Sequence, residues 1–313
     1  MCIIIYTVYD PFRLYYEVRR LKDFFRTAAR RFRSAAAVLL ILSLLLWGAQ
    51  TLFAHRNAAF TPDYPMEDLT ALLSQERLSA ADYDTLFLQT GLGTPAIDAL
   101  LALGAQGRDQ ILSIQRQFFA APDTVCAELF GLFVREDRLA PDEHGQPVWG
   151  PPMPALEDGD VLLTYATHSM GWRHGHAGLV VDAAGQEALE AVVIGSDAAV
   201  MNIGHWRSYS NYLVLRLRER TPELQSELTA WALEHLEGVP YRLFSGLLGP
   251  KAPDPGIPGF GLQCAHLIWY AFQQFGCDVD ADGGRLVTVD DLARSPLFEV
   301  VQLYGLDPRQ WMS

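Results

Sequence analysis

Two segments of this chain carry the residue types of a cysteine nucleophile and a histidine base. His176 lies in residues 175–182 (GHAGLVVD), and Cys264 lies in residues 261–270 (GLQCAHLIWY). A thiol attacks as the thiolate, and a neighbouring imidazole can take its proton and return it to a leaving group. The pair therefore predicts thiolate–imidazole chemistry, with the histidine first in the chain.

Both residues are predicted to lie at the start of a rigid element. The apolar run that follows His176 is bounded by small residues and is typical of a central strand over 176–181. Cys264 follows a run rich in proline and glycine and precedes apolar residues at helical spacing, which predicts a helix over 263–275. Free N–H groups and the dipole at a helix start favour a thiolate and can polarise a carbonyl oxygen.

A third polar residue, Glu190, falls within the next predicted strand, 188–194. Because an unpaired carboxylate in a buried strand is costly, we expect Glu190 to accept the second N–H of His176 and orient its ring. The alternative is that Glu190 faces solvent on a half-exposed strand. Taken singly, Cys264 also fits a small buried hydrophobe and His176 a structural histidine, and only their combination favours catalysis.

These segments resemble the permuted NlpC/P60 superfamily, the YiiX/YycO-like branch of papain-like cysteine hydrolases. The resemblance covers about residues 154–298 and implies Cys264 as nucleophile, His176 as base and Glu190 as the third polar residue. Tyr241 is a candidate for the substrate pocket, with a core aromatic as the alternative. Ala265 and Val289 stand where this branch commonly has serine and proline. The segments similar to family motifs are 156–163 (LEDGDVLL), 175–180 (GHAGLV), 238–241 (GVPY), 263–265 (QCA) and 287–292 (VTVDDL).

The pattern around these motifs predicts an α+β domain over 121–313, with an antiparallel-rich sheet and packed helices; the resemblance implies a permuted papain-like fold. The strand at 212–217 alternates Leu213, Leu215 and Leu217 with Arg216, which predicts a sheet edge or a partly exposed face. The other predicted strands are 161–165, 176–181 and 188–194. A helical segment, 55–120, is expected to precede this domain, and cap and breaker residues predict helices over 80–90, 94–104 and 108–119.

An apolar run, 35–54, is long enough to span a bilayer as one transmembrane helix. Residues 1–34 carry eight basic and three acidic side chains, and the positive-inside rule places this tail in the cytoplasm and the rest of the chain outside. The alternatives are a cleaved signal peptide and a buried core helix. The long apolar run and the extended basic tail argue against the signal peptide.

The remainder of the chain is strongly acidic. The whole chain has a net charge of −13, and residues 35–313 alone have a net charge of −18. This negative charge argues against nucleic acid as a partner. It also argues against electrostatic binding to anionic lipid headgroups. No cofactor or metal is expected, because His168, His174, His176 and Asp182 do not follow a metal-ligand spacing. A disulfide between Cys126 and Cys277 would leave Cys264 free.

The sequence therefore predicts a single-pass cell-membrane protein with an extracytoplasmic thiol hydrolase domain. A cell-wall peptide amide is the leading substrate, on the basis of this location. A lipid-linked amide, ester or thioester is the alternative substrate for the same fold. A non-catalytic envelope binding or scaffold protein is the alternative from another class, and a cytoplasmic catalytic domain is the alternative location.

Overall fold

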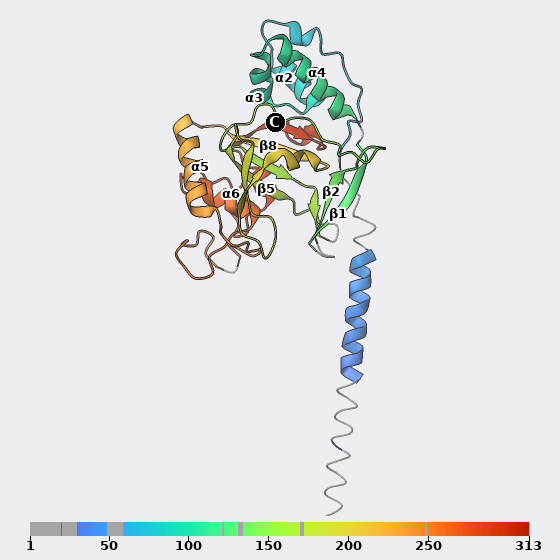
Figure 1. Ribbon diagram of the computed structural model, residues 1–313, viewed down its shortest axis with the longest axis vertical. Coiled ribbons are helices and arrows are strands. Elements are labelled where there is room, and N and C mark those ends of the chain that lie inside the picture. Colours follow the sequence, from blue (N-terminus) through green and yellow to red (C-terminus); the bar gives the residue numbers. More distant parts are fainter. Residues whose placement is uncertain are drawn as a thin grey trace, which may run out of the picture. The chain divides into compact units, whose positions relative to one another are not determined.

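The computed structural model describes residues 20, 30–48, 59–120, 122–130, 134–169, 172–247 and 249–312. The chain divides into two compact units, Met1–Leu52 and Phe53–Ser313. The described part of the first unit contains a helix over Arg30–Gly48, drawn in blue in Figure 1, with a mean hydropathy of 1.5. By length and composition this helix can cross a membrane. It begins before the predicted span, and residues 49–54 of that span lie outside the described residues.

The second unit begins with the predicted helical segment. The capping box of Ser79 and the left-handed Gly91 fix the ends of the first of these helices, as the sequence predicted. The segment is attached to the last strand of the main sheet, because Gly93 N–H donates to Val301 O and Leu303 N–H donates to Gly91 O. Its elements are η1 (Leu72–Ser74), α2 (Ala80–Thr90), α3 (Thr94–Leu101) and α4 (Ala105–Phe119).

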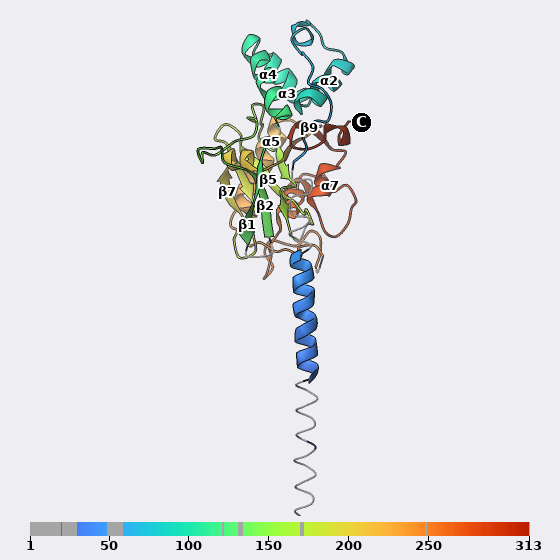
Figure 2. The same ribbon diagram turned by 90° about the vertical axis from the view of Figure 1, so that its right-hand side faces the viewer.

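The main sheet has six strands in the order β7-β6-β5-β3-β8-β9, and every neighbouring pair is antiparallel. The predicted α+β class with an antiparallel sheet is therefore confirmed. Helices α5 and α6 pack against β5, and α7 packs against β3 and α6 (Figures 1 and 2). The strands are β3 (Val161–Thr164), β5 (His176–Asp182), β6 (Glu187–Glu190), β7 (Ala199–Asn202), β8 (Tyr212–Leu217) and β9 (Phe298–Tyr304), and the helices are α5 (Pro222–Leu236), α6 (Cys264–Gln273) and α7 (Val289–Ala293). Short helices η2 (Ile203–Ser208) and η3 (Pro308–Gln310) complete the unit.

A smaller antiparallel sheet has the order β1-β2-β4. It is formed by β1 (Thr124–Phe130), β2 (Val134–Leu139) and β4 (Thr167–His168). The sequence did not predict this sheet, because β2 reads VREDRL and lacks the apolar alternation of a strand. Two of its acidic residues, Glu136 and Asp137, are nevertheless buried.

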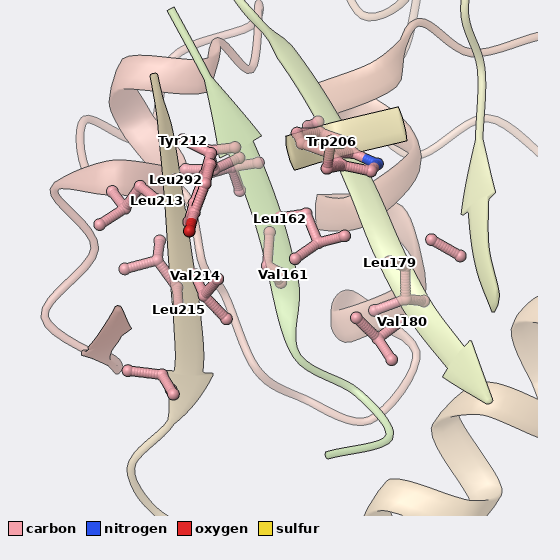
Figure 3. Packing of buried hydrophobic residues seen from close by; sticks show 14 of the residues in the cluster. Val161, Leu162, Leu179, Val180, Trp206, Tyr212, Leu213, Val214, Leu215 and Leu292 are labelled. Atoms are coloured by element: carbon pink, nitrogen blue, oxygen red, sulfur yellow. The ribbon is translucent and has the colours of Figure 1, made fainter. Parts of the chain in front are cut away.

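The core lies on the central strands of the main sheet. β3 and β8 are buried along their whole length, and β5 is buried up to its last residue. Figure 3 shows buried side chains from both faces of these strands: Leu162 and Val214 are cross-strand partners on one face, and Val161 and Leu179 are partners on the other. Burial of this apolar surface is the main force that holds the strands in register.

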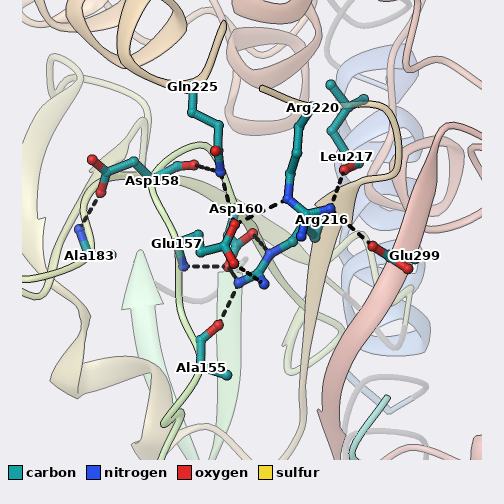
Figure 4. Close-up of polar contacts among 10 residues, drawn as sticks. All are labelled: Ala155, Glu157, Asp158, Asp160, Ala183, Arg216, Leu217, Arg220, Gln225 and Glu299. Carbon is teal, nitrogen blue, oxygen red and sulfur yellow. Dashed lines mark hydrogen bonds and ion pairs between the residues drawn. The ribbon is translucent and has the colours of Figure 1, made fainter. Parts of the chain in front are cut away.

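The prediction that β8 is an edge or partly exposed strand is wrong. β8 lies between β3 and β9, and all six of its residues are buried. Arg216 is tolerated there because its guanidinium binds both oxygens of Asp160 at 2.7 Å and Glu157 Oε1 at 2.6 Å. Figure 4 shows these partners around Arg216. They come from the turn before β3, so the alternation within β8 alone gave no sign of them.

Loss of the Arg216 guanidinium should destabilise the second unit strongly. Burial raises the pKa of Asp160 to about 6 despite Arg216, so the carboxylate is charged at pH 7.5 and depends on its partner. We expect Arg216→Met to cost about 3–5 kcal/mol, because it leaves a buried charge unpaired. This corresponds to a fall of roughly 6–20 °C in the melting temperature of the full-length protein, followed by tryptophan fluorescence.

Arg294→Met is the matched control, since Arg294 is 74% exposed and pairs with Asp290 one helical turn away. An exposed pair of this kind contributes little, and its loss should change the melting temperature by no more than about 2 °C. Equal melting temperatures for the two variants would contradict a stabilising role of the Arg216 network.

Candidate active site

The main sheet and α6 bring His176 and Cys264 together. His176 is the first residue of β5, Cys264 is the first residue of α6, and α6 packs against β5. Both side chains are buried, and Cys264 is among the groups that raise the pKa of His176. The structure thus brings the starts of two elements from distant parts of the sequence to the same region of the fold.

Glu190 lies on the other side of the imidazole ring. Its Oε2 is 2.8 Å from Nε2 of His176, and its side chain is only 1% exposed. Glu190 is therefore not the solvent-facing residue of the alternative reading. Because the carboxylate occupies Nε2, Nδ1 is the ring nitrogen left for the Cys264 thiol.

A glycine makes room for this carboxylate. Gly178 is the cross-strand partner of Glu190 in the β5–β6 ladder. A Cβ atom on Gly178 would lie 3.1 Å from Cγ of Glu190 and 3.0 Å from Cζ2 of Trp206. Any larger residue here would press on the side chain that orients His176, so the glycine at this position has a direct effect on the site.

The electrostatics favour a charged histidine. Burial alone would lower the pKa of His176, but hydrogen bonds with Cys264 and Glu190 raise it to about 10. Burial would raise the pKa of Glu190, but hydrogen bonds with His176 and His205 hold it at about 2. At neutral pH the site therefore has an ionised carboxylate beside an imidazolium.

Trp206 and His205 are part of the site, although the sequence analysis did not single them out. Nε1 of Trp206 donates to Glu190 Oε1 at 2.9 Å, and its ring stacks on His176 with centroids 5.4 Å apart. Nε2 of His205 lies 3.4 Å from Glu190 Oε2. Both residues lie on η2, and its sequence has neither the alternation of a strand nor the periodicity of a helix. The only signal in the sequence was that His205 and Trp206 are adjacent and both carry ring side chains.

The start of α6 is held in place by Gln263. Its Oε1 accepts the N–H of Ala265 at 2.9 Å and lies 3.4 Å from Cys264 Sγ, and its Nε2 donates to the Val287 carbonyl oxygen. Both ends of this amide are therefore occupied with positioning the helix. The N–H of Cys264, as the first residue of α6, has no acceptor within the helix and is available to a negatively charged oxygen.

Tyr241 lies in a segment that pairs with the residues just before α6. Burial and the charge of Cys264 raise the pKa of Tyr241, and its backbone forms a bridge with Leu262. His266 points elsewhere, because its ring nitrogens contact Ser245 Oγ at 2.9 Å and Lys251 O at 2.6 Å. His266 is therefore not placed to act as the base, as its position two residues after Cys264 predicted.

Cys126 and Cys277 are both free, so the disulfide that the cysteine count allowed is not formed. The sequence places His168 in the loop before the strand of His176, and the structure corrects this. His168 lies in β4, where its ring faces Cys126 across the small sheet at 3.7 Å, because the register of β1, β2 and β4 brings those strands together.

Comparison with known proteins gives one weak likeness. No protein-family model matches this chain, and no curated protein matches it. The chain is similar to a solved structure described as the metalloprotein YiiX from Escherichia coli O157:H7, DUF1105, with 17% identity and a TM-score of 0.34. The match covers 46% of this chain and 96% of YiiX. YiiX is thus a weak structural neighbour from the YiiX/YycO-like family, and a likeness of this size establishes neither a shared fold nor a shared activity.

Proposed function

We propose that this protein is a thiol hydrolase in which Cys264 attacks the carbonyl carbon of an acyl bond. The observation that carries the proposal is the buried row of Cys264, His176 and Glu190, in which the ring uses Nε2 for the carboxylate. With Nε2 on the carboxylate, Nδ1 is left for the thiol. A nucleophile, its base and an orienting carboxylate require the two ring nitrogens to be used in this way. The order of histidine before cysteine and the antiparallel sheet support a permuted papain-like architecture for the same domain.

The proposed mechanism has two halves. The Cys264 thiolate forms a bond to the carbonyl carbon, and the N–H of Cys264 at the start of α6 stabilises the oxyanion. His176 then gives its proton to the leaving group as the carbon–leaving-group bond breaks, which leaves a thioester on Cys264. In the second half, His176 takes a proton from water, the resulting hydroxide attacks the thioester, and the thiolate is released.

Glu190 and Trp206 support these proton transfers without taking part in them. The carboxylate stabilises the imidazolium whenever His176 carries the extra proton. Trp206 satisfies the second carboxylate oxygen and covers one face of the His176 ring. Both contacts keep the ring in one orientation while it accepts and returns a proton.

The membrane location and the first candidate substrate belong to the same proposal. The helix Arg30–Gly48 and the basic residues before it support a membrane anchor with the second unit outside the cytoplasm. Peptide amides of the cell wall are acyl bonds found in that compartment. A cell-wall peptide is therefore our first candidate substrate, and Tyr241 is the residue proposed to contact it.

A specific observation favours a second candidate, a lipid-linked acyl substrate. The segment 241–260, which leads from Tyr241 to the start of α6, exposes four large apolar side chains. Side chains of this kind mark sites that bind apolar partners when they are concentrated in one segment. A fatty acyl chain lying on them would bring its amide, ester or thioester towards Cys264. The exposed residues are Leu243, Phe244, Leu247 and Ile257.

The reactivity of Cys264 tests the proposed chemistry. Because His176 keeps its charge until the pH rises through about 10, alkylation of Cys264 in the full-length protein should be nearly constant from pH 6 to 9. Cys277 is the internal reference, because burial raises its pKa and its alkylation should increase about tenfold per pH unit in this range. Mass spectrometry resolves the two sites.

In His176→Ala, labelling of Cys264 should take the same steep pH dependence as Cys277. Parallel profiles for the two cysteines in the unmodified protein would contradict the thiolate–imidazolium pair and favour a binding role for this domain.

The charge of Glu190 should matter more than its shape. Glu190→Gln keeps the size of the side chain but removes the negative charge that raises the pKa of His176. A fall of one unit in this pKa would make His176 lose its charge around pH 9 instead of pH 10, so the alkylation rate of Cys264 between pH 9 and 10 should differ from that of the unmodified protein.

Glu187→Gln is the matched control, because Glu187 lies in the same strand and is exposed. It should leave the rate unchanged. Equal rates in the two variants would show that Glu190 does not act on the histidine.

The two substrate candidates are separated by incubating the full-length protein with cell-wall peptides or with vesicles that carry N-acyl and S-acyl lipids. Hydrolysis that Cys264→Ser abolishes identifies the substrate class, and an acyl–enzyme mass on Cys264 identifies the transferred group. A reporter fused to the C-terminus tests the location. A cytoplasmic signal would contradict a cell-wall substrate, and no turnover of either class would contradict both candidates.

A further inference from the structure

A second cluster of chemistry-bearing residues lies on the small sheet. Cys126 of β1 is the cross-strand partner of Asp137 of β2, and His168 of β4 is the partner of Arg135. Residues two apart in a strand share a face, so Arg135 and Asp137 point to the same side. The register therefore puts Cys126, Asp137 and His168 on one face of this sheet, one from each strand.

The three side chains approach one another closely. Nε2 of His168 is 3.7 Å from Sγ of Cys126 and 3.6 Å from Oδ1 of Asp137, and the three ligand atoms lie within 4.8 Å of one another. The side chains of Asp137 and His168 are 0% and 1% exposed.

Oδ1 of Asp137 is an unsatisfied buried acceptor within the part of the chain that the structure describes. It has no hydrogen-bond partner there, and its 3.6 Å separation from His168 is longer than a hydrogen bond. A buried carboxylate oxygen without a partner is costly. This atom, which faces the sulfur and the ring nitrogen, is the one that a ligand in the cluster would satisfy.

The arrangement of Cys126, His168 and Asp137 differs from that of a catalytic triad. In a triad the thiol and the carboxylate use different ring nitrogens, as proposed for Cys264 and Glu190 at His176. Here the sulfur of Cys126 and the oxygen of Asp137 both face Nε2 of His168, and no described residue bonds Nδ1 of that ring. Sulfur, nitrogen and oxygen that converge on one point are arranged as ligands around a cation.

Two of the three spacings between the ligand atoms fit a tetrahedral cation. Ligand atoms about 2.0–2.3 Å from a tetrahedral zinc ion lie about 3.3–3.8 Å from one another. The two distances from Nε2 of His168, 3.6 and 3.7 Å, fall in this range.

The carboxylate of Asp137 is also held from outside the cluster. Nη2 of Arg173 donates to Oδ2 of Asp137 at 2.6 Å, and the backbone N–H of Asp137 donates to Ala166 O at 3.0 Å. These contacts leave Oδ1 turned towards the sulfur and the ring nitrogen, which is the usual task of groups behind a metal ligand.

We propose that Cys126, Asp137 and His168 bind a divalent transition-metal ion of the zinc type, with water or another small ligand in the fourth position. A thiolate, an imidazole and a carboxylate are the ligand types that zinc takes in proteins. Binding releases the thiol proton of Cys126, so the affinity falls as the pH is lowered.

The ion links all three strands of the small sheet. β4 is followed by the segment that leads to His176, and the charges of His168 and His176 both act on His174 in that segment. The site is independent of the proposed hydrolase chemistry, because it uses none of the same residues.

Cobalt(II) is the probe, because a thiolate bound to it gives a charge-transfer band and a tetrahedral site gives visible bands. The full-length protein should show both, saturating at one ion per chain. Cys126→Ser should abolish the charge-transfer band, whereas the matched variants Cys277→Ser and Cys264→Ser should keep it. Absence of the band, or its loss in either matched variant with retention in Cys126→Ser, would overturn the proposal.

A second measurement uses the unmodified protein and does not depend on any variant folding. Zinc alone should slow alkylation of Cys126 by at least about tenfold, since the bound thiolate is masked, while Cys277 in the same chain keeps its rate. Unchanged labelling of Cys126 at saturating zinc would overturn the site. Protection of Cys264 alone would place the ion at the other cysteine–histidine pair and would equally overturn it. Neither result would alter the test of the hydrolase proposal, which is made without metal.

Discussion

The ionised carboxylate of Glu190 is buried, and the arrangement of the candidate active site follows from the need to satisfy it. His176 and Trp206 contact its two oxygens, and His205 lies beside one of them. A buried charge is stable only when paired and hydrogen-bonded. The β5–β6 register sets the carboxylate beside Gly178, whose missing side chain leaves the space for this group. The orientation of the His176 ring towards Cys264 is a consequence of the same contacts.

A buried positive charge in the main sheet, that of Arg216, is satisfied in the same way. Arg216 is buried in β8 because Asp160 and Glu157 surround its guanidinium. Alternation of apolar and charged residues usually indicates a strand with one exposed face. That rule failed here because the turn before β3 supplies the counter-charges, and a pattern read within one strand contains no information about the partners that a neighbouring turn brings.

His176 and His168 show how neighbouring residues decide the chemistry of a histidine ring. At His176 the carboxylate of Glu190 uses Nε2, and in the proposed mechanism Nδ1 exchanges a proton with Cys264. At His168 a carboxylate and a thiol face the same nitrogen, and the ring can instead share a cation with them. The residue types are the same in both places. The difference arises from strand register, which sets the direction from which each partner approaches the ring.

The sequence by itself determined the elements whose ends carry local signals. Ser79 and Gly91 fixed α2, the apolar run after His176 predicted β5, and the residues around Cys264 predicted a helix with the cysteine in its first turn. These follow from periodicity and capping, which act over a few residues. Only the tertiary structure decided that Trp206 joins Glu190 and that Cys126, Asp137 and His168 meet. Those contacts depend on the register between strands far apart in the chain, and no short-range pattern encodes it.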